Sequence, residues 1–346
     1  MASDQKPYDW RETLNQIGPS DPERVGLEAY AEALTSRNLP VIFGLDDLAL
    51  VLGTESRLLQ HIFHARQKFY RAFDIPKRRG GSRTISAPFP TLLQFQRWIN
   101  TEIFSKLGMH ESAYGFVHGK SIIMNAKQHL GCETLLKIDL KDFFPSIGLR
   151  RVLRIFRWLG YTPTVSFYLA SLCTLDDCLP QGAATSPALS NLIARRLDLR
   201  LSAAAKIASL SYTRYADDLT FSGNHVSAST MHLVKSIVES EGFSINNEKT
   251  LLANGQKKIV TGISVSGDRL KLPRSTRRAL RQEFHFVRKR GVLSHMAATQ
   301  QHNPLYVESL LGKFAFWASV EPENDFAAEG ITFLRGVQKA LDSGNL

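Results

Sequence analysis

The N-terminal part of the chain shows hydrophobic residues at helical spacing. Apolar side chains recur through residues 45–52 and again through 58–63, and Gly53 lies between the two runs. This periodicity predicts two short amphipathic helices. Such a pair can form a helix-turn-helix or a packing unit of a larger fold, and nothing else in this region favours the first interpretation. Residues 1–25 are polar and contain three prolines, so we expect a loose arm there.

Two runs of strand-forming residues predict a β-hairpin at residues 69–90, with a glycine turn at 79–82 between them. Four cations surround this turn, and they are Lys77, Arg78, Arg79 and Arg83. Two interpretations remain open. The tip can be a solvated surface, or it can bind phosphates, which guanidinium groups hold through paired hydrogen bonds.

A second predicted hairpin carries acidic residues at its tip. Its short strands, 210–215 and 219–222, are separated by three residues that include Asp217 and Asp218. Aspartate is common in turns because its side chain bonds to nearby backbone. Two like charges between strand formers are nevertheless unfavourable unless a cation binds them.

A further predicted strand, 134–138, ends at Asp139, which lies 78 positions before Asp217. Only the fold can bring these acids together, and each of them can also be a plain surface carboxylate. Hard divalent cations prefer carboxylate oxygens. Two such ions about 4 Å apart can activate an attacking hydroxyl and stabilise departing pyrophosphate. The acids are therefore a candidate magnesium site.

The composition indicates a class of partner only through its charge. The 346 residues include 43 Lys and Arg against 32 Asp and Glu, a net charge of +11 that favours a polyanionic partner. A hydrophobic content of 43% excludes a disordered chain. Three cysteines without paired spacing support neither a disulfide framework nor a zinc site. No apolar run approaches the ~20 residues of a membrane span, so we expect a cytoplasmic protein without membrane attachment.

The strongest charge run lies in the C-terminal third. Residues 269–290 contain nine Lys or Arg and one acid, Glu283. Ser275 can cap a helix in which Leu280 and Phe284 mark an apolar face and arginines mark another. A charged face is usually just solvated, but a one-sided basic stripe also suits a nucleic-acid backbone. Further along the chain, Phe314, Phe316 and Trp317 are expected to form core.

The acids lie within blocks that resemble a known family. YADD at 215–218, LLKIDLKDFFPSI at 135–147 and LPQGAATSPALSN at 179–191 are similar, in this order, to the palm of a reverse transcriptase. The likeness runs from about Tyr70 to beyond Gly262. It implies an α+β right-hand polymerase with fingers, a palm with an antiparallel sheet and a catalytic YADD hairpin, and a helical thumb. The implied domains are an N-terminal arm at 1–25, interleaved fingers and palm at 26–262, and an RNA-binding thumb at 263–346.

The resemblance implies RNA-directed DNA synthesis from deoxynucleoside triphosphates. It makes Asp139, Asp217 and Asp218 the catalytic acids that bind two Mg²⁺ ions, for which Mn²⁺ can substitute, and it makes the Leu140 carbonyl a further metal ligand. The residues implied to bind the nucleotide are Lys77, Arg83, Phe144, Gln181, Gly182 and Lys249. A solvated Lys249 beside an acid is an open alternative.

Phe144 stands where the family places a ring under the incoming sugar. A ring there collides with a ribose 2′-hydroxyl and so selects deoxynucleotides by shape. Both Phe143 and Phe144 can instead be core residues, and we expect Phe143 to be one. Ala184 departs from the family, since many relatives have proline there. This substitution frees the loop slightly and affects no catalytic assignment.

Two shorter blocks narrow the family. Residues 125–129 read NAKQH, similar to an NAxxH block, and residues 260–262 read VTG. Both blocks mark bacterial retron reverse transcriptases, although a helix turn and a strand end would account for either alone. The residues implied to bind RNA are Asn125, His129, Val260, Thr261 and Gly262, together with Arg274, Arg277, Arg278 and Arg281 of the basic run.

Retron enzymes use a structured noncoding RNA as primer and template, and they attach the first nucleotide to a guanosine 2′-hydroxyl. The resemblance therefore implies a cognate RNA, a branched RNA–DNA product called msDNA, a separately encoded effector protein and a role in anti-phage defence. Alternatives are an enzyme of the group II intron or diversity-generating kind, or an inactive RNA-binding relative. Only 84 residues follow Gly262, so we expect neither intron-type C-terminal modules nor a ribonuclease H domain.

Overall fold

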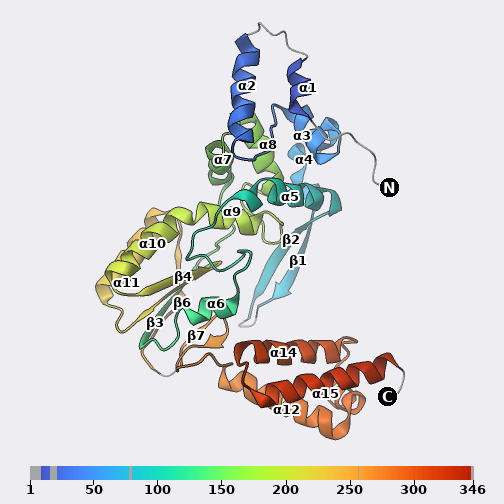
Figure 1. The fold of residues 1–346 in the computed structure, drawn as a ribbon, viewed down its shortest axis with the longest axis vertical. Helices are drawn as coiled ribbons and strands as arrows, with labels where there is room; N and C mark the ends of the chain where they lie inside the picture. The colour runs from blue at the N-terminus through green and yellow to red at the C-terminus, as the bar shows by residue number, and fades with distance from the viewer. Residues whose placement is uncertain (1–8, 16–21, 78–79, 256, 344–346) are drawn as a thin grey trace.

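The computed structural model describes residues 9–15, 22–77, 80–255 and 257–343. The molecule is elongated, with N-terminal helices at one end, C-terminal helices at the other and a β-sheet between them (Figure 1). The strands pair antiparallel, and the fold is a mixture of helix and sheet as predicted. No helix within these four ranges is both long and apolar enough to cross a bilayer.

Short helices form the N-terminal end. They are α1 (Trp10–Asn15), α2 (Pro22–Thr35), α3 (Leu45–Leu52) and α4 (Ser56–His64), followed by the 3₁₀ turn η1 (Arg66–Phe69). The predicted helix pair is confirmed as α3 and α4, and Gly53 ends α3 with φ 65°. The prediction of a loose arm is wrong for the described part of residues 1–25, because this part forms the helix α1, in which Leu14 is buried. Apolar burial offsets the entropy of ordering this helix.

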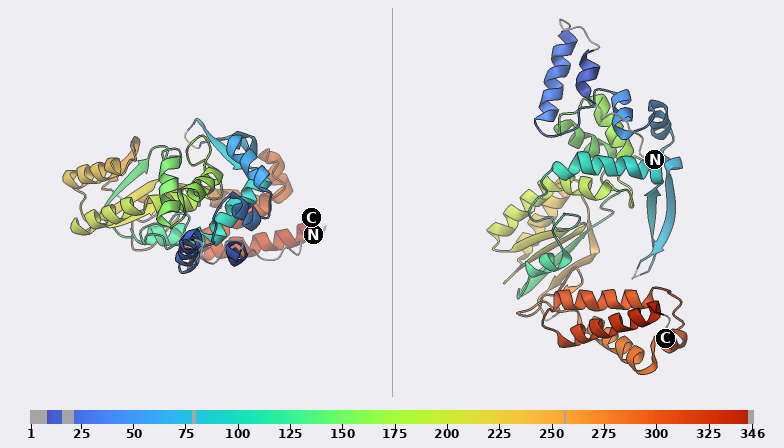
Figure 2. Two further views of the ribbon diagram at one scale, coloured as in Figure 1. Left: turned by 90° about the horizontal axis from the view of Figure 1, so that it is seen from above. Right: turned by 45° about the vertical axis from the view of Figure 1, so that its right-hand side comes forward.

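A long β-hairpin follows these helices. Strands β1 (Tyr70–Pro76) and β2 (Ser82–Pro88) pair without interruption, which confirms the predicted hairpin. The hairpin runs along the molecule with its turn directed toward the C-terminal helices (Figure 2). Arg78 and Arg79 of the predicted turn lie outside the described residues.

The central sheet has four antiparallel strands in the order β4-β5-β3-β6. They are β3 (Thr134–Leu140), β4 (Ser211–Tyr215), β5 (Asp218–Gly223) and β6 (Ile245–Ala253). β3 occupies the middle because its apolar side chains are buried on both faces. The acidic hairpin is tighter than predicted, since Asp218 already belongs to β5 and only Ala216 and Asp217 form the turn. Ala216 has φ 55°, as short hairpin turns require.

Helices surround this sheet and complete the first hydrophobic core. Their bounds are α5 (Pro90–Glu102), η2 (Phe104–Lys106), α6 (Ile122–Lys127), α7 (Leu149–Trp158), α8 (Pro163–Cys173), α9 (Ser186–Ile193), α10 (Arg195–Ile207) and α11 (Ala228–Ser240). α10 packs on β4 and α11 on β6, whereas α6 contacts β4 together with two short strands near the C-terminal helices. The acidic hairpin is thus held between helices on both sides.

The C-terminal part contains the short pair β7 (Ile259–Val260) and β8 (Ile263–Ser264) and the helices α12 (Arg274–Arg290), α13 (Val292–Ala298), α14 (Tyr306–Val320) and α15 (Asp325–Asp342). A second hydrophobic core holds them together. The basic run forms α12 as predicted, with Leu280 and Phe284 buried. Ser275 does not cap it, because the helix begins one residue earlier, after Pro273. Phe314 and Trp317 are buried in this core, as expected, whereas Phe316 is half-buried against it.

Candidate active site

Three carboxylates from two distant segments meet where β3 and β5 pair. Asp139 on β3 and Asp218 on β5 are direct register partners, so their side chains lie on the same face. The Leu140 N–H donates to the Asp217 carbonyl at 2.9 Å, which ties the turn to β3. The fold therefore closes the 78-residue separation between Asp139 and Asp217.

Burial and mutual repulsion act on these acids. Burial, and after it the charge of Asp218, raises the pKa of Asp217. Burial also raises the pKa of Asp218, while Lys137 opposes the rise and Asp139 adds to it. Raised values of this kind are typical of partly desolvated acids beside like charges. A cation at this place would relieve the repulsion.

Lys249 brings a positive charge to the same place. Its Nζ lies 3.0 Å from Oδ1 and 3.1 Å from Oδ2 of Asp139. The Asp139 side chain is 12% exposed and that of Lys249 is 52% exposed, so the ammonium covers the acid from the solvent side. Lys249 is therefore not simply a solvated lysine of β6.

A cavity of about 600 Å³ joins these groups to the β-hairpin. The predicted site residues that line it are Lys77, Arg83, Asp139, Leu140, Phe144, Gln181, Asp217 and Lys249. Lys77, which follows β1, and Arg83 of β2 thus face carboxylates from β3 and the acidic turn across one space. Such an arrangement suits a polyphosphate ligand between the two sets of charges.

The two neighbouring phenylalanines have different surroundings, as predicted. Phe143 is buried at 4% exposure and packs on Phe243, with 5.6 Å between ring centroids. Phe144 is half-buried and lines the cavity. Its ring also lies against Phe116, which the sequence patterns did not single out.

Gly182 packs against the β-hairpin. The Ser86 N–H donates to the Gln181 carbonyl at 2.7 Å, and a Cβ at Gly182 would lie 2.7 Å from the Ser86 carbonyl oxygen. Its φ of 124° also disfavours any side chain. This packing with β2 is a structural reason for the glycine that the sequence did not reveal.

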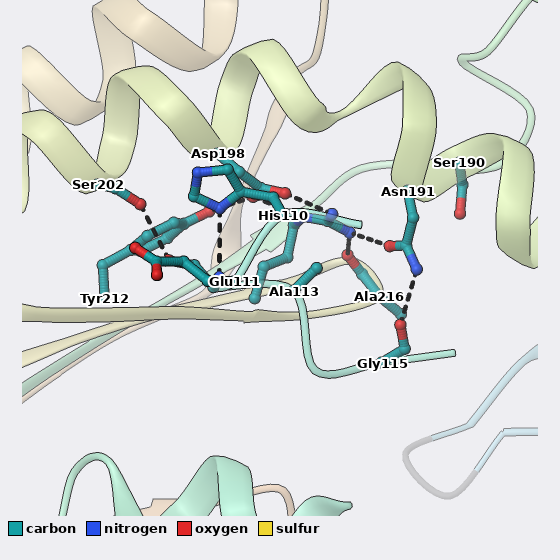
Figure 3. A network of polar contacts seen from close by, with 12 residues as sticks. His110, Glu111, Ala113, Gly115, Ser190, Asn191, Asp198, Ser202, Tyr212 and Ala216 are labelled. Carbon is teal, nitrogen blue, oxygen red and sulfur yellow. Dashed lines mark hydrogen bonds and ion pairs between the residues drawn. The ribbon is translucent and has the colours of Figure 1, made fainter. Parts of the chain in front are cut away.

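A buried polar network lies behind the acidic turn (Figure 3). Arg214 of β4 and Asp198 of α10 are 0% exposed and form an ion pair with 2.6 Å between Nη2 and Oδ2. The Tyr212 hydroxyl donates to Asp198 at 2.8 Å, and Arg214 Nη1 donates to Asn191 Oδ1 at 2.9 Å and to the Ala216 carbonyl at 3.2 Å. The only sequence signal for this network is a charged residue at position 214 between the strand-forming residues Thr213 and Tyr215.

The VTG block contacts the helix on which the NAxxH block begins. Thr261 Oγ1 donates to the Ile122 carbonyl of α6 at 3.0 Å. Asn125 and His129 are each 1% exposed and Val260 is 0% exposed. The structure therefore contradicts direct RNA contact by these three side chains, because they are buried. Thr261 is half-buried, and Gly262 is exposed in the β7–β8 turn with φ 83°.

The arginines of α12 differ in their contacts. Arg281 lies over the Phe326 ring at 5.2 Å, and Arg277 is half-buried. Arg288 forms an ion pair with Glu329. Arg274 and Arg278 are exposed, and within the described parts of the chain they have neither ion pair nor cation–π contact.

The donor set fits a hard divalent cation. Asp139, Asp217 and Asp218 offer carboxylate oxygens, Leu140 lines the same cavity as Asp139 and Asp217, and the Lys249 ammonium is paired with Asp139. Among the described residues, no three or more His, Cys, Asp or Glu side chains are grouped so that they could hold a metal ion in this geometry. A metal ion bound at Asp139 would have to displace the Lys249 ammonium.

Comparison with known proteins agrees with this geometry. Residues 75–286, more than half of the chain, match the family described as reverse transcriptase (RNA-dependent DNA polymerase). The chain is 34% identical to the retron Mx162 reverse transcriptase of Myxococcus xanthus, over 88% of this chain and 68% of that protein. It is 39% identical to the retron Mx65 reverse transcriptase of the same organism, over 76% and 68%. It is also 34% identical to the retron Ec86 reverse transcriptase of Escherichia coli, over 75% and 83%.

Proposed function

This chain belongs to the retron-type reverse transcriptases, which are RNA-directed DNA polymerases, and we propose that it copies a structured noncoding RNA into branched msDNA. In this proposal the RNA is both primer and template, and synthesis starts from a guanosine 2′-hydroxyl. One observation carries the proposal: acids, cations and Phe144 line a single cavity of about 600 Å³. That space suits a deoxynucleoside triphosphate.

The fold supports a right-hand arrangement. We assign the β1–β2 hairpin and the helices before β3 to the fingers, the four-stranded sheet to the palm, and α12–α15 to the thumb, with the boundary near Gly262. The separate core of the C-terminal helices supports this boundary. The exposed arginines of α12 support RNA binding by the thumb.

Asp139, Asp217 and Asp218 would hold two Mg²⁺ ions, with the Leu140 carbonyl as a further ligand. Bound Mg²⁺ would lower the pKa of the attacking hydroxyl and stabilise the charge of departing pyrophosphate. Asp139 exchanges its Lys249 partner, which frees the ammonium to face the phosphates. Chelation of Mg²⁺ should stop synthesis, and Mn²⁺ should restore it.

The other cavity residues position the nucleotide. Lys77 and Arg83 approach from the hairpin and would bind the triphosphate, because they face the acids across the cavity. Gln181 and Phe144 line the same cavity, and Phe144 would stack under the sugar. A ring at this place excludes a ribose 2′-hydroxyl by shape.

Asp217→Asn provides the first test. The amide keeps the size of the side chain but removes a charge that the chemistry needs, so DNA synthesis should fall by about 10²–10³-fold or more. RNA binding should persist, since α12 and the hairpin are untouched. The matched control is Glu248→Gln, which removes an exposed carboxylate of β6 and should leave synthesis intact. A parent protein that binds RNA but makes no DNA would identify an inactive relative.

The branched product needs a separate experiment. Purification of the protein from its host, followed by sequencing of the bound nucleic acid, should recover a DNA strand joined covalently to RNA through a 2′ linkage. Bound linear DNA and RNA without that linkage would contradict the priming proposal but not the polymerase activity. Proteins that copurify would identify the effector that we propose for anti-phage defence.

A further inference from the structure

The loop before α6 supplies a residue to the nucleotide cavity that no motif explains. Phe116 lines the cavity beside Phe144, and the two ring centroids lie 6.0 Å apart. Its side chain is 47% exposed, which is high for a large aromatic residue within a folded enzyme. Its backbone has φ 61°, an outlier for a bulky side chain that persists only where the surroundings impose it.

Gly115 explains how this conformation is imposed. A Cβ at Gly115 would lie 2.5 Å from the Ala216 nitrogen, so the loop rests directly on the acidic turn. The Gly115 carbonyl accepts a hydrogen bond from Asn191 Nδ2 at 2.9 Å, and Figure 3 shows the Asn191 amide between Gly115 and the rest of the network. The residue before Phe116 is therefore held on two sides.

Arg214 connects the loop and the turn. Its guanidinium donates to Asn191, which holds Gly115, and also to the Ala216 carbonyl. The buried Asp198 carboxylate fixes the guanidinium. Removing one partner of such a network leaves a buried group unpaired, so the loop and the turn have one joint arrangement.

We propose that Phe116 is a second sugar-selecting residue, and that Asn191 is the positioning residue that holds it. A ring can exclude a ribose 2′-hydroxyl by shape only if the ring cannot move aside. Phe144 is half-buried, and its ring contacts Phe143 on one side and Phe116 on another. Phe143 is core, so Phe116 supplies the wall on the cavity side, and without it the Phe144 ring can turn away from a 2′-hydroxyl. The inference rests on the polymerase activity and on the proposed sugar position, not on branched priming.

The test compares kcat/KM for a deoxynucleotide and the matching ribonucleotide on a DNA primer annealed to RNA. Phe116→Gly is the decisive variant, because glycine adopts a positive φ without strain and the fold is kept. We expect its deoxy-to-ribo ratio to fall about tenfold or more, in the same direction as Phe144→Ala. An unchanged ratio in Phe116→Gly overturns the proposal. A parent protein that does not extend the primer would refute the polymerase activity itself, and the inference with it.

Asn191→Asp tests the positioning role. The carboxylate can still accept from Arg214 but cannot donate to the Gly115 carbonyl. We expect a several-fold lower deoxy-to-ribo ratio. The control is Ser190→Ala, a neighbouring buried residue whose Oγ donates to the Pro187 carbonyl within the same segment. Equal losses of kcat/KM for both nucleotides in Asn191→Asp would show a structural role only, and Phe116→Gly would then stand alone for the sugar-selecting role.

Discussion

His129 shows how one buried polar residue can hold two strands. Its Nδ1 lies 2.7 Å from the Ser222 hydroxyl on β5, and its Nε2 lies 2.7 Å from the Thr213 hydroxyl on β4. Burial lowers the pKa of His129 to about 4, so the ring is neutral at pH 7 and one nitrogen donates while the other accepts. The imidazole thereby ties the turn after α6 to both strands of the acidic hairpin.

This arrangement predicts a specific loss of stability in acid. Between pH 6.5 and 4, His129 is protonated in the unfolded chain but stays neutral in the folded protein. The free energy of unfolding therefore falls as the pH drops. The fall from this group should reach about 3 kcal/mol at pH 4 and then stop. Urea unfolding at several pH values should show this slope in the parent and not in His129→Gln.

The control for that experiment is His225→Gln, which removes an exposed imidazole two residues after β5. Its stability should follow the pH profile of the parent. If His129→Gln also followed that profile, the imidazole would not be held neutral between Ser222 and Thr213, and the description of its role would be wrong.

The residues that we propose for the chemistry could be predicted because each lies in a short block of defined spacing. Asp139 and Asp217 were identified in this way, and the fold brings them together. Asn125 and His129 belong to such a block too, but a block does not reveal burial, and RNA contact was assigned wrongly. Arg214 was missed because the chain order does not show which partners a charged strand residue meets.

At the level of helices and strands, hydrophobic periodicity predicts that an element forms more reliably than it predicts the residues where that element begins and ends. The basic run forms α12 because its apolar positions repeat at helical spacing, and those positions pack in the second core. Its start differs from the prediction, since Pro273 precedes the helix and Ser275 lies inside it. Helix ends depend on neighbouring segments as well as on local capping residues.

The contacts of α12 show which of its arginines are available to bind the RNA of the proposed function. Arg274 and Arg278 should contribute most, because they are exposed and, among the described residues, have no acidic partner. In Arg274→Ala/Arg278→Ala we expect weaker RNA binding and a slope of log K against log salt that is shallower by about 2. A titration of fluorescent RNA at several salt concentrations measures this.

The matched control is Arg288→Ala on the same helix. Arg288 is paired with Glu329, so its loss frees an acid as well as a cation and should leave the slope nearer to that of the parent. If the slope changed by the same amount per arginine removed in both variants, α12 would act through its total charge and not through particular phosphate contacts.

Across the whole molecule, the central sheet separates two hydrophobic cores. Leu136 on β3 belongs to the first core, and its neighbour Leu135 belongs to the second, with Ala126 of α6 and Val260 of β7. Successive strand residues point to opposite faces, so this division follows from the pleat of β3. Leu135 and Leu136 are the same type of residue, so the sequence does not show that they face different cores, and the two cores could not be predicted for that reason.

Gly330 allows the second core to be disturbed alone. A Cβ at Gly330 of α15 would collide with the buried Phe314 ring of α14, so Gly330→Ala should destabilise the C-terminal helices by about 1–3 kcal/mol. Hydrogen exchange should become faster in α14 and α15 and stay unchanged in β3 and β5, and RNA affinity should fall while the acids keep their arrangement. Gly336→Ala on the same helix is the control, because its Cβ meets nothing within 4 Å. Alanine there should stabilise the helix. Faster exchange in both cores would mean that the sheet transmits the disturbance and that the molecule unfolds as one unit.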